Sequence, residues 1–276
     1  MHASEPGTRY SKGARMRVLA VGLGLTGFVT SAIAADLPVK TPPPPAPVFS
    51  WNGFYFGPHI GGGWANGDAQ TVSSPSPGFF DPFRSDLKGT GVVAGVQVGF
   101  NWQLAPNWVL GWEGDISGTT IDETATQNTA TIQSIPLFPA SSLTLTRNIN
   151  WLGSLRGRIG VSWDRALLYF TGGVAWAGVT FQAALVRPIL PNIFVVSDGD
   201  TRTGWVIGGG LEYAFEDTNW TMRGEFLHYQ FDGFRVDAPP FNGFTAQDTL
   251  GNFNVNVVRV GFNYKYGGQP SVPARY

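Results

Sequence analysis

The feature that most constrains this chain is an alternation of apolar with small or polar residues downstream of Phe49. Between Thr90 and Leu104, the even positions are Val, Ala, Val, Val, Phe, Trp and Leu, and the odd positions are mostly Gly, Gln and Asn. Successive side chains of a β-strand point to opposite faces, so this period of two predicts an amphipathic strand. The same pattern predicts eight strands, at residues 52–64, 90–104, 107–117, 147–163, 166–179, 202–215, 219–231 and 254–266.

The connections between these segments alternate in length. The tight ones are Ala105-Pro106, Asp164-Arg165 and Glu216-Asp217-Thr218. The long ones are residues 65–89, 118–146, 180–201 and 232–253. Each segment is long enough to cross a bilayer, which takes about 9–11 tilted residues, and transmembrane barrels join their strands by short periplasmic turns and longer outer loops. We therefore predict an all-β fold: an eight-stranded antiparallel transmembrane β-barrel with four long extracellular loops, three short periplasmic turns and both termini in the periplasm.

The charge of the chain indicates which face meets lipid. A soluble barrel covers its outside with charge, whereas an outer-membrane barrel turns its apolar face to lipid and its polar face inward. Charged residues make up only 13% of this chain, against about 25% in ordinary soluble domains. In segment 147–163, we assign Ile149 and Trp151 to the lipid face and Asn150 to the interior. The predicted interior network has nine charges: Glu113, Asp115, Arg156, Arg158, Glu212, Arg223, Glu225, Arg259 and Lys265.

Aromatic residues gather near the predicted strand ends. Trp and Tyr prefer the interface between lipid and water, where they form girdles around barrels. The sequence therefore predicts an aromatic girdle of Trp64, Trp102, Trp108, Tyr264 and Tyr266.

The N-terminal region predicts export. A basic stretch ending at Arg17, a short apolar run from Val18 to Val29 and an Ala-Ile-Ala site at 32–34 have the order of a secretory signal peptide. We predict cleavage after Ala34, with translation starting at Met1 or Met16; the alternative is an uncleaved anchor helix. Residues 35–50 form a Pro-rich periplasmic linker, 51–266 the barrel and 267–276 a C-terminal extension. Without residues 1–34 the formal charge is −4, which argues against a nucleic-acid partner.

No catalytic, cofactor or metal site is predicted. His59 has inward parity and His228 lipid-facing parity, and no Ser lies beside either at strand spacing. Cys is absent, and no His, Asp and Glu grouping has metal-ligand spacing. The interior charges fit either a narrow polar gate or the stabilisation of a closed barrel. We favour the closed barrel, because eight strands leave barely enough lumen for side chains.

Several stretches of the chain resemble a known family. Ala35-Asp36-Leu37-Pro38, 51–57 (WNGFYFG), 168–176 (LYFTGGVAW) and 258–266 (VRVGFNYKY) are similar to alphaproteobacterial outer-membrane immunogenic proteins, over about residues 31–268. The resemblance implies a small barrel inserted by the barrel-assembly machinery, and surface roles in envelope integrity, host contact and immune recognition. The assembly signal would be a terminal aromatic residue, either Tyr266 or Tyr276.

We therefore predict an integral protein of the Gram-negative outer membrane, with a structural and surface-antigen role and no enzymatic activity. Its expected partners are outer-membrane lipid and lipopolysaccharide, the assembly machinery during insertion, and host or envelope components bound through the long loops. One alternative is a porin-like channel for small solutes. The other is loop-mediated ligand or host binding, for which residues 73–83 and 186–196 offer apolar and Pro-rich surface.

Overall fold

The computed structural model describes residues 49–74, 83–129, 141–186, 194–237 and 245–266. The predicted signal peptide, most of the linker and the C-terminal extension lie outside these ranges. Within them, no helix is long and apolar enough to cross a membrane. The strands are β1 (Gly53–Ser74), β2 (Phe83–Gln103), β3 (Trp108–Thr129), β4 (Ser141–Trp163), β5 (Ala166–Val186), β6 (Phe194–Ala214), β7 (Trp220–Phe231), β8 (Phe234–Asp237) and β9 (Thr245–Tyr266).

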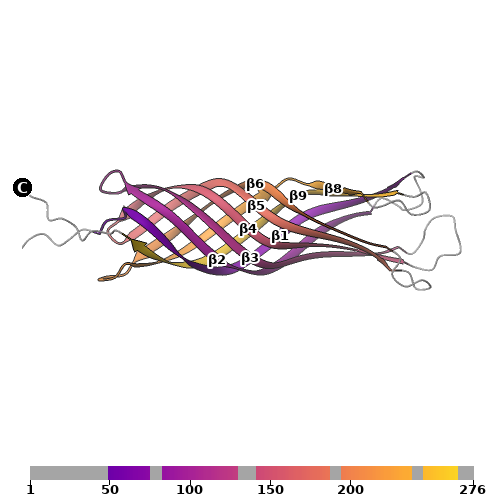
Figure 1. The fold of residues 1–276 in the computed structure, drawn as a ribbon, viewed down its shortest axis with the longest axis horizontal. Helices are drawn as coiled ribbons and strands as arrows, with labels where there is room; N and C mark the ends of the chain where they lie inside the picture. Colours follow the sequence, from indigo (N-terminus) through magenta and orange to yellow (C-terminus); the bar gives the residue numbers. More distant parts are fainter. Residues whose placement is uncertain (1–48, 75–82, 130–140, 187–193, 238–244, 267–276) are drawn as a thin grey trace, which may run out of the picture. The chain divides into compact units, whose positions relative to one another are not determined.

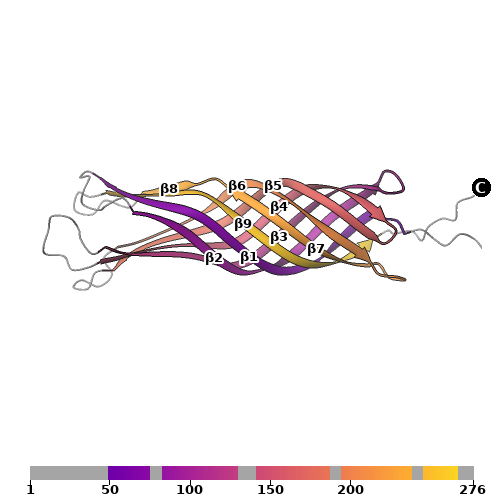
Figure 2. The ribbon, with the colours of Figure 1, turned by 180° about the vertical axis from the view of Figure 1, so that it is seen from behind.

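The strands close into an antiparallel ring, which confirms the predicted fold. Each strand from β1 to β7 pairs with the next, β7 pairs with β9, and β9 returns to pair with β1. β8 continues the course of β7 along β9, after a short interruption at Asp232-Gly233, so the ring has eight positions. Figures 1 and 2 show the strands slanting across the barrel, as closure of a sheet requires.

Three tight connections lie at one end of the barrel, which we call the turn end. They occupy residues 104–107, 164–165 and 215–219, close to the predicted positions. Asp164 and Asp217 have φ of 51° and 53°, the left-handed conformation that Asp tolerates better than most residues. Gly53 and Tyr266 also lie at this end, because β1 starts there and β9 finishes there.

The four predicted long loops are wrong in extent. Most of residues 65–89, 118–146, 180–201 and 232–253 continue the strands, and only 75–82, 130–140, 187–193 and 238–244 lie outside the described residues. The Phe- and Pro-rich stretch at 73–83 and the one at 186–196 therefore fall largely where the structure describes nothing. Strands of 21–23 residues are about twice what a bilayer needs.

A band of apolar side chains surrounds the half of the barrel nearest the turn end. On β1 it runs from Phe54 to Trp64, and Ile60 in its middle is 62% exposed. The ten steps between these two residues, at about 3.3 Å each and tilted by about 40°, give a band about 25 Å tall. Since this is the height of the lipid-facing belt of outer-membrane barrels, the predicted lipid face is the observed one.

One predicted orientation is wrong. Ile149 is buried inside the barrel and Asn150 is exposed outside, the reverse of the assignment from simple alternation. A register shift between Ile149 and Trp151 in the β4–β5 pairing, a β-bulge, inserts one extra residue. A bulge shifts the alternation by one residue, so both faces exchange beyond it.

Beyond the apolar band the two faces exchange their chemistry; we call this part the far section. Its outside carries exposed polar residues, including Arg84, Lys88, Asp122 and Thr124. Its inside is mainly apolar apart from one buried ion pair, Glu123–Arg147. The apolar cluster that we call the upper core consists of Ala69, Leu87, Ala125, Leu145, Phe181, Ala183 and Leu250. The prediction of an interior made of small residues and charges therefore holds only for the part of the barrel inside the apolar band. The far section is built like a protein surrounded by water.

In the far section the ring divides into two sheets. Pairing of β2 with β3 stops at Gly89–Glu123, and pairing of β6 with β7 stops at Gly204–Phe231. Among the described residues, the far ends of β3, β4, β5 and β6 form one four-stranded sheet, and those of β8, β9, β1 and β2 form another. Figure 1 shows these strands running more nearly lengthwise toward that end. The upper apolar core lies between the two sheets, as in a β-sandwich.

Candidate functional site

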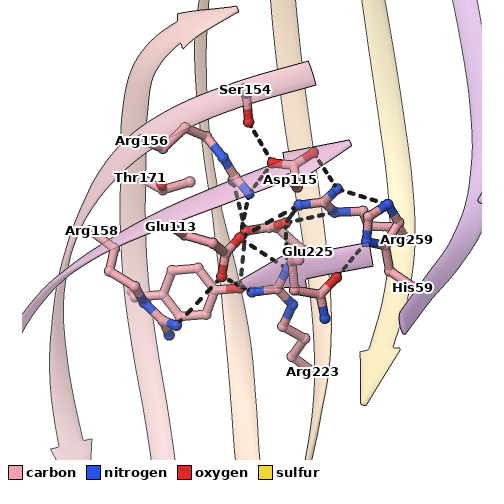
Figure 3. A network of polar contacts seen from close by, with 12 residues as sticks. His59, Glu113, Asp115, Ser154, Arg156, Arg158, Thr171, Arg223, Glu225 and Arg259 are labelled. Atoms are coloured by element: carbon pink, nitrogen blue, oxygen red, sulfur yellow. Dashed lines mark hydrogen bonds and ion pairs between the residues drawn. The ribbon is translucent and has the colours of Figure 1, made fainter. Parts of the chain in front are cut away.

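The interior at the level of the apolar band is occupied by a network of eight charged side chains. Glu113 and Asp115 come from β3, Arg156 and Arg158 from β4, and the remaining four from β6, β7 and β9. All are at most 9% exposed. Figure 3 shows the guanidinium groups converging on the carboxylates in the middle of the barrel. The members are Glu113, Asp115, Arg156, Arg158, Glu212, Arg223, Glu225 and Arg259.

Glu113 is the centre of the network. Its carboxylate accepts hydrogen bonds from Arg156 and from both terminal nitrogens of Arg223, one of them at 3.0 Å. The hydroxyl of Tyr55 donates to it at 2.7 Å. Arg158 and Arg259 lie 3.8 and 3.7 Å from its oxygens. One carboxylate therefore faces cations from β4, β7 and β9, and ties opposite walls of the barrel together.

The other carboxylates complete a neutral set. Asp115 lies 3.0 Å from Arg156 and 3.1 Å from Arg259. Glu225 lies 3.0 Å from Arg156 and 2.6 Å from Arg259. Four acids face four arginines, which matters because a buried charge is costly unless it is paired and hydrogen-bonded. At this level, the paired side chains take the space through which a solute would have to pass.

Lys265, the ninth predicted member, lies apart from the other eight. Its Nζ donates to the carbonyl oxygen of Ser50 and lies 4.3 Å from the ring centre of Phe49. Lys265 thus fixes the segment before β1 at the turn end instead of joining the network.

Trp51 closes the interior at the turn end. Its side chain is fully buried against Val109, Leu167 and Ala214. Its indole N–H donates to the carbonyl oxygen of Asp164 at 3.2 Å. The sequence pattern predicts no role for Trp51, because this residue stands at the start of the barrel domain, just before the alternation begins.

Above the network, toward the far end, the interior becomes apolar. A cluster that includes Val93, Ile121, Leu152, Phe231 and Val257 fills this level. Next to it lies a buried ion pair, in which Arg147 Nε donates to Glu123 at 2.5 Å and the Arg147 guanidinium lies 4.3 Å from the ring centre of Phe253. The sequence pattern does not reveal this pair, because it predicts a loop at Glu123. Continued alternation through Ile121, Glu123 and Ala125 was the signal that could have found it.

We expect the Glu123–Arg147 pair to be replaceable by apolar residues. Arg147 Nη1 and Nη2 and Glu123 Oε1 have no hydrogen-bond partner, so the pair keeps much of its desolvation cost. The double variant Glu123→Leu/Arg147→Met should have a free energy of unfolding within about 1 kcal/mol of the wild type. Arg147→Met alone should lose about 3 kcal/mol, because it leaves Glu123 buried without a partner. Urea unfolding of the refolded protein measures both. A double variant that is much less stable than Arg147→Met alone would contradict this expectation.

His59 has neighbours that the sequence did not suggest. Its Nε2 lies 2.7 Å from Ser117 Oγ, and its Nδ1 contacts Gln97. No Ser lies beside His59 at strand spacing, but Ser117 reaches it from another strand, because β3 approaches β1 across the interior although β2 lies between them. A serine nucleophile needs a base that can become positively charged. Here Arg259 Nη1 lies 3.2 Å from the imidazole and opposes that charge, and Gln97 stands where a carboxylate would compensate it.

Two further predicted features can be placed. His228 lies at the edge of the apolar band, where its Nδ1 is 2.7 Å from Asn256 Oδ1. Within the described ranges, no three His, Asp or Glu side chains are grouped so as to hold a metal ion.

The predicted girdle residues lie at both edges of the apolar band. Trp64 is at the far edge, and Trp102, Trp108, Tyr264 and Tyr266 are at the turn end. Further aromatic residues share these two levels and were not included in the predicted girdle. At the far edge they are the half-buried Trp151 and Trp176 and the exposed Trp205, and at the turn end they are the exposed Trp163, Tyr213 and Trp220.

A closed antiparallel barrel with an apolar outer belt and a charged interior defines an integral outer-membrane β-barrel protein. The chain belongs to the family described as outer membrane protein beta-barrel domain, whose model matches residues 31–266.

The chain is 33% identical over 250 residues to the 31 kDa outer-membrane immunogenic protein of Brucella melitensis biotype 1, covering 87% of this chain and 95% of that protein. It is 29% identical over 253 residues to the 25 kDa outer-membrane immunogenic protein of Brucella canis, covering 89% and 96%. It is 28% identical over 273 residues to a 22 kDa outer membrane protein of Rhizobium leguminosarum bv. viciae, covering 91% and 100%.

The family and the apolar belt together locate the protein in the outer membrane of a Gram-negative bacterium. The turn end is then periplasmic and the far section extends outside the cell, since short turns of such barrels lie in the periplasm.

Proposed function

We propose that the protein is a closed structural barrel that anchors a rigid, polar outer section at the cell surface, and that it is neither a channel nor an enzyme. The observation that carries this proposal is the filled interior. Trp51, the eight-charge network, the apolar cluster and the Glu123–Arg147 pair follow one another along the barrel axis. Each level is packed with side chains of very low exposure.

The same filling argues against catalysis inside the barrel. His59 and Ser117 are 4% and 2% exposed, so a substrate would have no approach to them. A general base must reach its substrate within hydrogen-bond distance, and the two imidazole nitrogens of His59 are already engaged by Gln97, Ser117 and Arg259.

The outer surface supports contact with membrane components. The exposed aromatic residues at both edges of the band suit the lipid interface, and the polar exterior of the far section suits the sugar and phosphate layer of lipopolysaccharide. We propose these lipids as its constant partners, with insertion by the barrel-assembly machinery and recognition by host or envelope components at the exposed end.

A conductance measurement tests the closed barrel. Protein refolded into planar lipid bilayers should give no steady single-channel current over a range of voltages, while an open porin inserted in the same way supplies the positive control. Circular dichroism and the heat-dependent shift in gel mobility establish that the inserted protein is folded. Stable channels of uniform conductance from the folded wild type would overturn the proposal and favour small-solute transport.

A further inference from the structure

Several strand edges in the far section have no neighbour among the residues that the structure describes, and the longest of them belongs to β6. β6 pairs with β5 without a register shift as far as Phe194. Its pairing with β7 ends at Gly204, and β8, on the other side of the gap, has only four residues and pairs with β9 alone. Residues 197–201 are all exposed, in contrast to the alternating burial found along most of the barrel. The stretch 194–203 therefore offers an open edge.

The direction of the backbone groups on this edge follows from the regular pairing. Ala214 N–H donates to Arg165 on the β5 side at 2.8 Å, and Phe215 N–H donates to Trp220 on the β7 side at 3.1 Å. Alternate residues of a strand bond to opposite neighbours. The odd-numbered residues Ser197, Gly199 and Thr201 thus direct their N–H and C=O groups to the open edge.

The side chains around this edge give it a chemical preference. Thr201 N–H donates to the carboxylate of its own neighbour Asp200 at 2.6 Å, which covers one open amide. Arg202 lies 2.6 Å from Asp200 and stacks on the Phe234 ring at 4.0 Å. Asp198 is exposed and, within the described residues, has no ion pair. Two carboxylates on one face of the strand favour basic residues at alternate positions of an added strand.

A second copy of the chain is a poor occupant. Two copies of the barrel in one membrane have the same orientation relative to the membrane normal. A two-fold axis along that normal would therefore place the two β6 edges side by side as parallel strands. Near-equal register would then place Asp198 and Asp200 beside their own copies. Like charges on neighbouring strands are destabilising.

We propose that the β6 edge docks an extended peptide segment of another protein, which adds as a β-strand and carries Lys or Arg at alternate positions. A basic side chain would bind Asp198, and the next would compete for Asp200 and so release the Thr201 amide for backbone pairing. Added strands of this kind obtain affinity from main-chain hydrogen bonds and specificity from alternate side chains.

The experiment uses the full chain refolded into lipid discs and two synthetic peptides. One peptide alternates Lys and Thr over seven residues, and the other alternates Glu and Thr. We expect the Lys peptide to bind about tenfold more tightly and to slow hydrogen exchange of the Ser197 and Gly199 amides. A Lys peptide with N-methylated amides, which cannot complete the backbone ladder, should bind weakly and leave exchange unchanged.

Charge reversal separates docking at this edge from general attraction. Asp198→Lys should reduce the preference for the Lys peptide at least several-fold, whereas Asp122→Lys, an exposed change on β3, should leave it unchanged. Retained heat-dependent gel mobility shows that both variants fold. Equal binding of the two peptides, or unchanged exchange at Ser197 and Gly199 with bound Lys peptide, would overturn the proposal.

Discussion

Replacing Glu113 by alanine is expected to lower the free energy of unfolding by about 3–5 kcal/mol. Glu113 accepts hydrogen bonds from Arg156, Arg223 and Tyr55 in a part of the barrel that water does not reach. Its loss leaves the four arginines facing three carboxylates, so one buried positive charge becomes uncompensated. Urea titration of the protein refolded in detergent micelles or lipid vesicles, followed by tryptophan fluorescence, measures the change.

Two comparisons show whether the effect comes from charge balance. Asp86→Asn removes an exposed carboxylate that pairs with Lys88 at 3.6 Å and should change stability by less than about 0.5 kcal/mol. The double variant Glu113→Ala/Arg223→Met restores neutrality and should be less destabilised than the two single changes added together. Strict additivity would mean that the network contributes by packing alone.

The alternating pattern was sufficient to predict the barrel, because lipid and the interior impose opposite chemistry on the two faces. Ile60, Val96 and Phe170 are among the most exposed apolar side chains in the molecule, as their positions in the pattern required. The eight charges that meet inside were identified by the same parity. The pattern determines the face on which a residue lies, however, but not which residue it contacts. The convergence of four arginines on Glu113 and Glu225 could therefore not be predicted, because it depends on closure of the barrel.

The features that the sequence pattern does not predict occur where the strands leave lipid for water, where a bulge shifts the alternation, and where strands that are not neighbours meet. In the far section the outside is polar and the inside mainly apolar, so the pattern predicts a loop around Glu123, where β3 in fact continues. The bulge at Ile149 moves the pattern by one residue, and a single sequence gives no signal of the insertion. The His59–Ser117 contact joins strands that are not neighbours, and strand spacing does not report such contacts.

Gly57 has very little room for added volume, because it lies on the seam where the first and last long strands meet. A Cβ at Gly57 would overlap the carbonyl oxygen of Phe262 and lie 2.9 Å from the Cα of Asn263, both in the backbone of β9. Neither strand can move away freely, because β1 is paired with β2 at Gly57–Gln97 and β9 is paired with β7 at Asn263–Thr221. Gly57→Ala should therefore cost about 3 kcal/mol, at the upper end for overpacking, and should lower the refolded fraction.

Gly224→Ala is the matched control, because a Cβ there meets nothing within 4 Å on the outer face of β7. Its stability should stay within about 1 kcal/mol of the wild type and tend upward, since alanine restricts the unfolded chain more than glycine does. The refolded fraction is measured for both variants by heat-dependent gel mobility, and stability by urea titration. Equal behaviour of the two variants would mean that the β1–β9 seam is loose enough to admit a methyl group. A large loss in Gly57→Ala alone would show that closure of the ring requires β1 and β9 to approach at this glycine, so the smallest residue is selected here by the seam and not by strand flexibility.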